Sequence, residues 1–372
     1  MKAIISRVDL AKLTLKLQSV IPTRPAIPIL ANLLLEARDG QLILTATDLI
    51  VSMRLYMEAK VVTPGAITIP ARRFFQLIRE LTSPQIEINA PTPDSALISA
   101  GTSKFKLVGM DKTEFPDFPD MKEALSFSMK SSAVKEMLSR SSFAASRDDS
   151  RQVFNGTLLK VHSGIAECIG TDGKRLAKTS ADVPVDTTFS GEYILPIKAV
   201  EEILHLLDGS SEMVKLSLMA GKVGIDSDST QLVTMLVSGN YPDITRIVPE
   251  KGENPLILHR EELISLLRQV NLFTPDNSSS ARFIFEQGEL QIIAQSGDVG
   301  EGNVAMAVNY SGEPLTLALN PHYFLDILRH STDETVALTI SNPFNPALIT
   351  DSTTAQFVIM PMRIQSESLA GV

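Results

Sequence analysis

The sequence predicts an α+β fold in which one kind of domain is written three times in tandem. The chain has 372 residues, so each third would hold 124 residues, close to the commonest domain size. Two helix signals and a set of strand signals recur at nearly the same interval in every third. We therefore expect three similar domains, each with two helices packed on antiparallel sheets of about eight short strands.

Each third begins with an amphipathic helix, because apolar side chains recur there at spacings of three and four. In the first third these are Leu10, Leu13 and Leu17. The corresponding residues of the other two thirds are Val134, Met137, Leu138, Leu263, Leu266, Leu267 and Val270. The expected helices span residues 7–20, 131–142 and 259–270.

Strand-like alternation follows each of these helices and is interrupted by a turn glycine. The turns are Asp39-Gly40, Ser163-Gly164 and Gln287-Gly288, at intervals of 124 residues. Glycine at this place is typical of a tight β-hairpin. The same antiparallel hairpin is thus predicted three times.

A second helix in each third opens directly after an extended run. The residue at the opening is Pro70, Pro196 or Asn320, at intervals of 126 and 124 residues. Proline suits the first helical turn because its missing N–H would be unpaired there. The expected helices span 70–81, 196–207 and 321–330.

Two aromatic-Pro-Asp triplets close the first and second thirds. They are Phe115-Pro116-Asp117 and Tyr241-Pro242-Asp243, 126 residues apart, and a polar connector follows each. We expect domains at residues 1–120, 127–248 and 253–364, followed by a tail at 365–372.

Composition excludes several classes of protein. With 44% hydrophobic and 21% charged residues, the chain can bury sizeable cores and is not intrinsically disordered. The single cysteine, Cys168, excludes an internal disulfide and a cysteine-based zinc site, and favours the reducing cytoplasm. Neither a signal peptide nor a transmembrane helix is expected.

No segment carries a clear motif for catalysis, a metal or a cofactor. Gly170–Arg175 has glycines and a lysine like a phosphate-binding loop, but their spacing is wrong, and a hairpin turn at Asp172-Gly173 explains it better. Gly300–Ala305 begins like a dinucleotide fingerprint but continues as a strand. Asp226-Ser-Asp228 lacks the glycine and distal glutamate of a calcium loop. A binding or structural role is favoured over an enzyme.

The predicted helices carry an excess of positive charge, although the whole chain has a formal net charge of −9. If the helices face one surface, that surface would attract phosphates without reading bases. For any single residue, a solvated polar helix face is the simpler explanation. The main contributors are Lys12, Lys16, Arg72, Arg73, Arg79, Lys135, Arg140, Lys198 and Arg268.

Six fragments together resemble the bacterial sliding clamp family, the beta subunit of DNA polymerase III. They are Ile21–Asn32, Ile69–Phe75, Phe154–Gly156, Thr171–Ala177, Asn240–Asp243 and Val358–Ile364. The resemblance implies a non-catalytic processivity factor without cofactor. Two chains would form a head-to-tail homodimer whose six domains close into a ring around duplex DNA, with the helices lining the hole. Tethering to such a ring raises the local concentration of a polymerase at the primer end.

The resemblance assigns DNA contact to seven residues in four parts of the chain. Arg147 lies in the segment Ser146–Arg151, which also contains two aspartates. A local ion pair with these aspartates explains an arginine here as well as DNA contact does. Arg24 stands in a loop between two prolines and has little structural reason to be there. The seven residues are Arg24, Arg72, Arg73, Arg147, Arg151, Gln152 and Lys198.

The resemblance also implies a hydrophobic pocket between the second and third domains for short peptides of partners: the clamp loader, the replicative polymerase and other proteins. Methionine and proline beside branched aliphatic residues make an adaptable apolar surface. The segment 358–364 is equally explained as a terminal core strand. The implied pocket residues are Phe154, Thr171, Gly173, Lys174, Arg175, Leu176, Pro242, Arg246, Ile247, Asn320, Tyr323, Val358, Ile359, Met360, Pro361, Met362 and Arg363.

For the ring interface, the resemblance pairs an edge strand of one subunit with the third domain of the other. Alternating lysines suit an edge strand that must pair only with its proper mate. The implied residues are Lys104, Phe105, Lys106, Leu107, Leu272, Phe273, Asp298 and Glu301.

Three segments depart from the pattern of the family: Asn277–Ser280, Pro343–Pro346 and the tail Gln365–Val372. The shape of the pocket and its choice of partners are therefore the least constrained expectations. We hypothesise that the tail competes with peptides for the pocket. The leading function is a DNA-encircling clamp. A dimeric protein scaffold that does not load on DNA is the alternative, and an enzyme with a site assembled from scattered acids ranks third.

Overall fold

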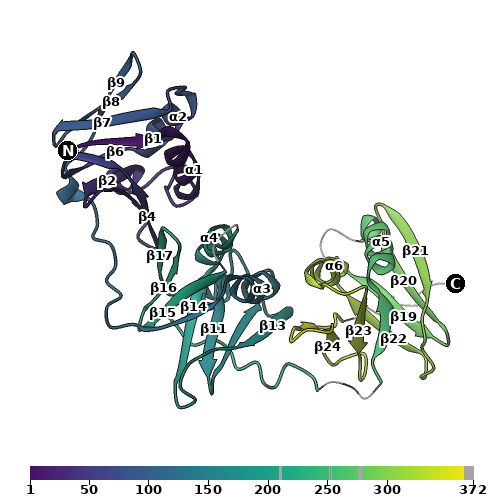
Figure 1. The fold of residues 1–372 in the computed structure, drawn as a ribbon. Helices are drawn as coiled ribbons and strands as arrows, with labels where there is room; N and C mark the ends of the chain where they lie inside the picture. Colours follow the sequence, from purple (N-terminus) through teal and green to yellow (C-terminus); the bar gives the residue numbers. More distant parts are fainter. Residues whose placement is uncertain (209–211, 251, 253, 275–278, 364–372) are drawn as a thin grey trace. The chain divides into compact units, whose positions relative to one another are not determined.

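The computed structural model describes residues 1–208, 212–250, 252, 254–274 and 279–363. These residues form six α-helices and 25 strands, drawn in Figure 1. By their contacts they divide into two compact units, one of residues 1–135, 183–186 and 193–238, the other of residues 136–182, 187–192 and the chain from 239.

One order of elements occurs three times along the chain: strand, helix, strands, helix, three strands. The first repeat contains β1 (Lys2–Ser6), α1 (Arg7–Leu17), β2 (Asn32–Arg38), β3 (Gln41–Thr47), β4 (Val51–Glu58), β5 (Lys60–Thr63), β6 (Gly65–Pro70), α2 (Ala71–Glu80), β7 (Gln85–Thr92), β8 (Ser95–Ala100) and β9 (Ser103–Val108). The second contains β10 (Leu125–Lys130), α3 (Ser131–Ser142), β11 (Gly156–His162), β12 (Ile165–Thr171), β13 (Arg175–Asp182), β14 (Ser190–Pro196), α4 (Ile197–Leu207), β15 (Met213–Met219), β16 (Lys222–Ser227) and β17 (Thr230–Met235). The third contains β18 (Leu256–His259), α5 (Arg260–Val270), β19 (Ala281–Glu286), β20 (Glu289–Ser296), β21 (Gly300–Ala307), β22 (Leu315–Leu319), α6 (Pro321–His330), β23 (Thr335–Thr339), β24 (Ala347–Thr350) and β25 (Gln356–Ile359).

The threefold repeat and all six predicted helices are confirmed. Five helices begin and end within one residue of the predicted bounds. The exception is α1, which ends at Leu17 instead of residue 20. Pro22 follows closely and disfavours helical backbone at the residue before it, so the chain leaves the helix there.

The predicted hairpin turns are also confirmed. Gly40, Gly164 and Gly288 have φ values of 73°, 75° and 80° between β2 and β3, β11 and β12, and β19 and β20. Asp39 and Ser163 before the first two glycines also have positive φ. Two successive residues with positive φ match the twist of antiparallel strands, which is why glycine recurs at this place.

The first unit holds two sheets, one in the order β5-β1-β7-β8-β9 and one in the order β10-β15-β16-β17-β4-β3-β2-β6. Strands of the second repeat and of the first repeat are joined in the larger sheet by the antiparallel pair β17–β4. The hydroxyl of Ser19, after α1, donates to the buried carboxylate of Glu202 on α4 at 2.6 Å. This bond satisfies a charge that would otherwise be costly to bury.

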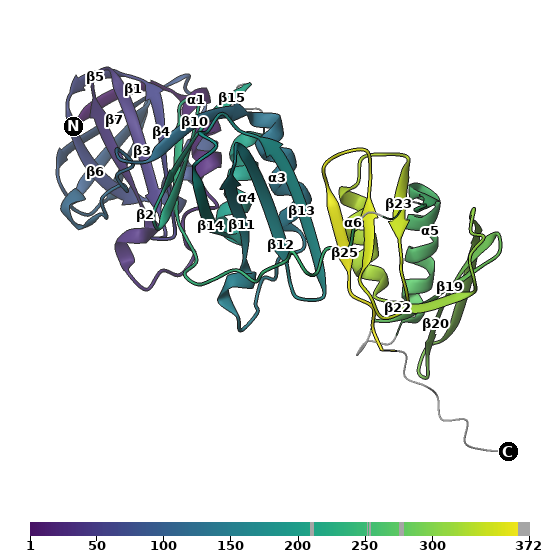
Figure 2. The same cartoon turned by 90° about the horizontal axis from the view of Figure 1, so that it is seen from below.

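The second unit repeats this plan. Its larger sheet runs β14-β11-β12-β13-β25-β24-β23-β18, and its smaller sheet runs β21-β20-β19-β22. The antiparallel pair β13–β25 joins the second repeat to the third. Figures 1 and 2 show α5 and α6 side by side, with β20 next to α5. Phe283, Phe285 and Phe324 are fully buried in the core between these elements.

A buried ion pair fastens α3 to the loop between β24 and β25. Arg140 on α3 donates to Asp351, and their side chains are 4% and 0% exposed. It also donates to Glu136 at 3.2 Å and to the hydroxyl of Thr353 at 2.7 Å. The prediction that Arg140 contributes to a phosphate-attracting helix surface is therefore wrong, because its charge is neutralised inside the protein.

The close packing of β12 on α3 depends on a glycine. A Cβ atom placed on Gly170 would lie 2.1 Å from the backbone oxygen of Ser141. We predict that Gly170→Ala lowers the free energy of unfolding by about 1–3 kcal/mol, since either the helix or the strand must move. Urea unfolding followed by circular dichroism measures this change.

The matched control is Gly297→Ala, because a Cβ atom at Gly297 meets nothing within 4 Å. We expect that variant to unfold at the same urea concentration as the unaltered chain. Equal unfolding midpoints for Gly170→Ala and the unaltered chain would show that α3 does not constrain β12.

Candidate functional site

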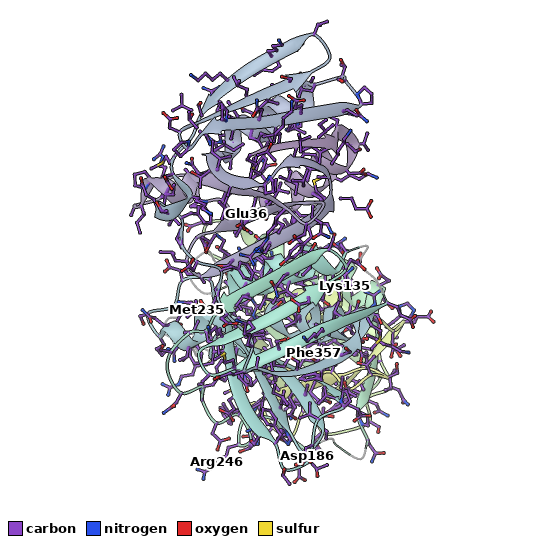
Figure 3. All side chains as sticks on the ribbon, turned by 60° about the vertical axis from the view of Figure 1, so that its left-hand side comes forward. Glu36, Lys135, Asp186, Met235, Arg246 and Phe357 are labelled. Carbon is purple, nitrogen blue, oxygen red and sulfur yellow. The ribbon has the colours of Figure 1, made fainter. Side chains whose placement is uncertain are left out.

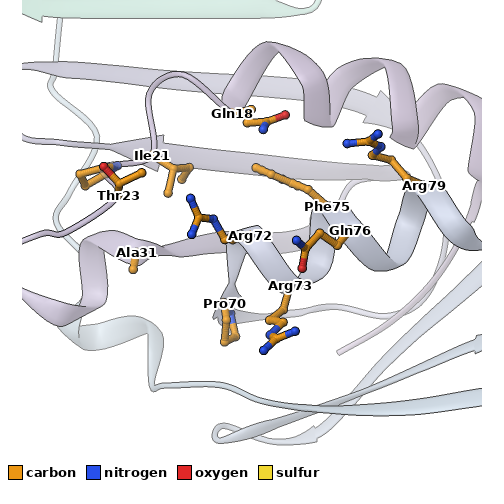
Figure 4. Close-up of a pocket in the computed structure, with 11 residues that line it drawn as sticks. Gln18, Ile21, Thr23, Ala31, Pro70, Arg72, Arg73, Phe75, Gln76 and Arg79 are labelled. Atoms are coloured by element: carbon orange, nitrogen blue, oxygen red, sulfur yellow. The ribbon is translucent and has the colours of Figure 1, made fainter.

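A cavity of about 530 Å³ lies in the first unit, between the end of α1 and α2. Arg72, Phe75 and Arg79 project from one side of α2 toward Gln18 and Ile21 (Figure 4). They can do so because positions three and four apart share a helix face. The full lining is Gln18, Ile21, Pro22, Thr23, Ala31, Pro70, Arg72, Arg73, Phe75, Gln76 and Arg79.

The cavity is electropositive. Within the described part of the chain, Arg72, Arg73 and Arg79 have no carboxylate partner. The first turn of α2 contains no acidic residue, and Pro70 provides no side-chain cap. The free backbone N–H groups at this end of the helix add to the attraction for anions. Such a cavity is suited to bind the oxygen atoms of phosphate groups.

The seven residues predicted to contact DNA fall into different surroundings. Arg72 and Arg73 line the cavity, and exposed Arg24 follows Thr23, which also lines it. Lys198, in the first turn of α4, donates to Asp48, whose side chain is 11% exposed. Its ammonium group is therefore already paired within the first unit. Arg79 was predicted to contribute to the positive charge of the helices but was not among the seven predicted DNA contacts, although its spacing of seven residues from Arg72 places both on one helix face.

Arg147, Arg151 and Gln152 lie in the second unit, at the segment that enters the 3₁₀ turn η3 (Gln152–Asn155). All three are exposed. The Arg151 guanidinium donates to Asp149 at 3.0 Å and lies 4.1 Å from the centroid of the Phe154 ring. Hydrogen bonds from Arg151 hold the pKa of the Asp149 carboxyl at about 2. The sequence left two explanations for the arginines of this segment, DNA contact or a local ion pair with the aspartates. Arg151 forms the local ion pair.

Several predicted pocket residues meet where β12 turns into β13. We call this turn, Thr171–Arg175, together with Met360 the second corner. The Asp172 carboxylate accepts from the backbone N–H groups of Lys174 and Arg175 at 2.9 and 3.0 Å, and Gly173 N–H donates to the Thr171 hydroxyl at 3.0 Å. Met360 N–H donates to the Lys174 carbonyl at 2.9 Å. The prediction of a hairpin turn at Asp172-Gly173 is confirmed.

Arg175 connects this turn to α6. Its guanidinium donates to Asp326 at 2.6 Å, to Asp172 at 3.1 Å and to the carbonyl of Phe143 at 3.1 Å. It also lies 4.7 Å from the ring centroid of Tyr323. With its donors used inside the protein, Arg175 holds the corner in shape instead of offering a free charge.

The remaining predicted pocket residues divide into buried supports and exposed groups. Val358, Ile359 and Leu176 are at most 2% exposed, so they form the core beneath the surface, as the core-strand interpretation predicted. Asn320 caps α6 by accepting from His322 N–H at 2.9 Å. The buried Phe154 meets Tyr241 edge to face.

Exposed side chains at the surface of the second unit include Met360 and Ile247, each 37% exposed. Arg246 projects from its loop (Figure 3). Phe344 is 87% exposed at the tip of the loop that follows β23, where Asn342 accepts from its N–H at 2.9 Å. The sequence indicated an altered loop at 343–346 but not the exposed aromatic ring. The tail 365–372, like residues 277 and 278, lies outside the described residues.

Pro242 lines a separate cavity of about 440 Å³ over the outer strands of the second unit. A row of charged side chains crosses its floor, with Lys160 bonded to Glu192 at 2.9 Å and Lys178 to Glu167 at 2.5 Å. The other predicted pocket residues do not line it.

Among the described residues, each of the four sheets has two end strands that are paired on one side only, and β9 in the first unit and β21 in the second are such strands. Lys104, Phe105 and Lys106 are exposed along β9, and Asp298 and Glu301 are exposed at the start of β21. Leu272 and Phe273 lie in the 3₁₀ turn η4 (Asn271–Phe273), which packs beside β21. A Cβ atom at Gly302 of β21 would lie 2.5 Å from the Phe273 ring.

No feature of the described residues supports catalysis. They contain no group of three His, Cys, Asp or Glu that would hold a metal ion. Burial raises the pKa of the Cys168 thiol to about 12, so it is not a nucleophile at neutral pH. In the described part of the chain, no helix is both long and apolar enough to cross a bilayer.

Comparison with known proteins accounts for all three repeats. The family models "DNA polymerase III beta subunit, N-terminal domain", "central domain" and "C-terminal domain" match residues 1–119, 128–243 and 245–363. The chain is 49% identical to the beta sliding clamp of Chlamydia pneumoniae, over 99% of this chain and 100% of that protein.

Solved structures agree with this match. A sliding clamp (DNA polymerase III subunit beta) from Pseudomonas aeruginosa bound to griselimycin is 29% identical, with a TM-score of 0.93, and the match covers 98% of this chain and 100% of that one. A sliding clamp from Bartonella birtlesii bound to griselimycin is 28% identical, with a TM-score of 0.92 and the same coverage.

Three repeated domains of this plan, joined by a strand pair at each junction, are those of a clamp-type processivity factor. The chain belongs to the DNA polymerase III beta subunit family, and it is a bacterial sliding clamp. The resemblance stated from six sequence fragments is confirmed.

Proposed function

We propose that two copies of this chain associate head to tail into a ring that encircles duplex DNA, and that the second corner tethers polymerase and other replication proteins to it in the cytoplasm. The interface, the DNA contacts and the peptide contacts are the parts of this proposal that need testing. The main observation in support of the proposal is that β9 is an edge strand with the apolar side chain of Phe105 exposed.

The exposed residue Phe105 on β9 has buried counterparts in the other repeats. Met110, Val237 and Met362 are equivalent, because their N–H groups donate to Thr68, Ile194 and Ala318 of β6, β14 and β22, which are equivalent strands. Counting back five residues makes Phe105 equivalent to Leu232 of β17 and Phe357 of β25. Both of these are 0% exposed, because β17 and β25 pair with the preceding repeat, whereas Phe105 is 38% exposed. An edge strand with this apolar side chain uncovered lacks its mate.

The internal pairs also predict the register of the missing one. In the second unit, Val358 lies opposite Leu176, and Phe357 lies opposite Ala177. The hairpin pairs Thr171↔Leu176 and Gln295↔Glu301 make Leu176 equivalent to Glu301, and hence Ala177 to Gly302. The same geometry between two subunits would place Lys106 opposite Glu301, and Phe105 opposite Gly302. Opposite charges on facing positions would favour this register over its neighbours.

For DNA, the proposal rests on the arginine-lined cavity. Arg72, Arg73 and Arg79 would contact phosphate oxygens, and Arg24 would extend this surface from the neighbouring loop. Such contacts carry no base information, so the protein can slide while the ring prevents dissociation. A closed ring explains how a chain with a net charge of −9 stays on DNA without a strongly basic surface.

For partners, the proposal rests on the exposed Met360 beside the rigid turn of the second corner. Ile247 is exposed to the same extent on the surface of the second unit. Two related clamps are bound to griselimycin. We propose that this chain binds griselimycin at the second corner, at the same surface as the peptides of its partners. The hypothesis that the tail 365–372 competes there is tested by deleting it and measuring peptide affinity.

The proposed register gives a charge-reversal prediction. Lys106→Glu and Glu301→Lys should each weaken the dimer, because each variant places like charges on facing strands. The double variant should restore it, since the pair is merely exchanged. Sedimentation velocity at micromolar concentration measures the dimer fraction, and purely monomeric unaltered protein would contradict the ring.

Ring closure is tested on the same variants with a clamp loader and nicked circular DNA. The unaltered protein and the double variant should remain on circles in high salt and leave after the DNA is linearised. Each single variant should be lost from both. Equal loss of the unaltered protein from circular and linear DNA would favour a scaffold that does not encircle DNA.

The arginine cavity predicts a salt-dependent contribution to DNA contact. The variant Arg72→Ala/Arg73→Ala/Arg79→Ala should bind duplex DNA more weakly at low salt, by fluorescence anisotropy. The slope of log affinity against log salt should become shallower by about 0.9 for each lost phosphate contact. Lys60→Ala, an exposed position on β5 outside the cavity, is the control and should leave the slope unchanged.

The second corner predicts a selective loss of ligand. Met360→Glu should weaken griselimycin at least tenfold in calorimetry, because a carboxylate replaces exposed apolar surface. The matched control is Met235→Glu, at the equivalent position in the first unit, where Met235 N–H donates to Ile50 as Met360 N–H does to Lys174. Equal affinities for both variants would place the ligand elsewhere.

A further inference from the structure

The turn between β3 and β4 in the first unit has the same construction as the second corner. We call this turn, Thr47–Val51, together with Met235 the first corner. The Asp48 carboxylate accepts from the N–H groups of Ile50 and Val51 at 2.9 and 2.7 Å, and Leu49 N–H donates to the Thr47 hydroxyl at 3.0 Å.

The strand pairing around the two corners is also the same. Met235 N–H donates to the Ile50 carbonyl at 2.8 Å, as Met360 N–H does to Lys174 at 2.9 Å. Val51 lies opposite Thr234, as Arg175 lies opposite Ile359. The chain therefore carries two copies of one backbone arrangement, and only side chains distinguish them.

The side chains at the two corners differ in one consistent way. In the second corner, Gly173 and Lys174 correspond to Leu49 and Ile50 of the first corner, 124 residues earlier. Arg151, which precedes the 3₁₀ turn η3 beside the second corner, corresponds in the same way to Ile27. All three replacements are branched apolar side chains, between 47% and 48% exposed. Figure 3 labels Met235, the equivalent of Met360, at the end of β17.

Leu49 occupies a backbone conformation that leucine rarely adopts. Its φ is 75°, close to the 82° of Gly173. The other described non-glycine residues with positive φ are aspartates and serines in turns. A bulky side chain in this region is strained, whereas glycine adopts it freely. The strain at Leu49 has no counterpart in the second corner.

The space above Gly173 indicates where a side chain at this position would lie. A Cβ atom there would be 3.4 Å from the Arg151 guanidinium and 3.7 Å from the Phe154 ring. A side chain at position 173 would therefore extend over the wall formed by η3. In the first repeat the corresponding wall, η1 (Pro28–Ala31), contains Leu30, packed with Phe115 as Phe154 is packed with Tyr241.

We infer that Leu49 closes the first corner to the peptides that the second corner accepts, and that Gly173 keeps the second corner open. The inference rests on the proposed function of the second corner. On this inference, the residue at one turn position explains why each chain has one peptide site and not two. The side chain of Leu49 occupies the surface on which a side chain of the ligand would otherwise pack. Ile27 occupies more of the same surface.

Exchanging the two residues tests the inference, with griselimycin as the probe and calorimetry as the measurement. The unaltered chain should bind one griselimycin. Leu49→Gly should bind two, and Gly173→Leu should bind at least tenfold more weakly. Leu49 itself demonstrates that this backbone accommodates leucine. A single cooperative urea transition for each variant checks that the fold is intact.

A second variant locates any new site. Adding Met235→Glu to Leu49→Gly should return the stoichiometry to one, because Met235 belongs to the first corner only. If the unaltered chain binds one griselimycin, a stoichiometry of one for Leu49→Gly would overturn the inference. A stoichiometry of two for the unaltered chain would also overturn it.

The outcomes separate this inference from the proposed function. If the unaltered chain fails to bind but Leu49→Gly binds one griselimycin at Met235, the role of the second corner is wrong while closure by Leu49 is supported. If neither binds, both are overturned. If Met360→Glu abolishes binding but Gly173→Leu leaves it unchanged, griselimycin binds at the second corner as proposed. The role inferred for Gly173 is then wrong.

Discussion

The antiparallel pairing of the last strand of one repeat with the fourth strand of the preceding repeat is the constraint on which the other features depend. It occurs as β17–β4 and as β13–β25, in the same register. Backbone hydrogen bonds fix this register, so they also fix which side chains face each other across the junction. The corner beside each junction is a direct product of the pairing, because the N–H of the strand-end methionine is bonded to the neighbouring turn. A candidate binding surface thus arises where two domains share one sheet.

Charge in this molecule is best understood by asking which positive groups already have partners. Arg140, Arg175 and Lys198 are tied to carboxylates of a neighbouring repeat, and each pair lies within one unit. Breaking the buried Arg140–Asp351 pair would be destabilising, because it would leave one charge without its partner in a poorly solvated place. Arg72, Arg73 and Arg79 instead surround a cavity with no carboxylate on its lining. A net charge summed over the sequence cannot separate these two uses of arginine, and it gives little guidance on contact with DNA.

Features determined by local sequence were predictable, and features that depend on distant partners were not. The six helices and the hairpin turns follow from apolar spacing and from glycine, so their bounds could be predicted closely. The burial of Arg140 depends on Asp351, 211 residues away, and the pairing of Lys198 depends on Asp48, 150 residues away. No spacing rule connects such residues. The candidate site was predicted only as a set of residues: the sequence could not distinguish the buried Val358 from the exposed Met360, nor indicate that Leu49 adopts a positive φ.

The edge strands β9 and β21 present different surfaces, and this has a consequence for assembly. A contact between two unlike surfaces of identical chains is heterologous, so each added copy again offers a free strand at both ends. Such a contact does not limit the number of subunits by itself. The angle through which each chain turns from one free strand to the other decides whether two copies close or an open filament grows. The internal junctions would then determine the size of the assembly, and substitutions far from the subunit interface would change how many chains the ring contains.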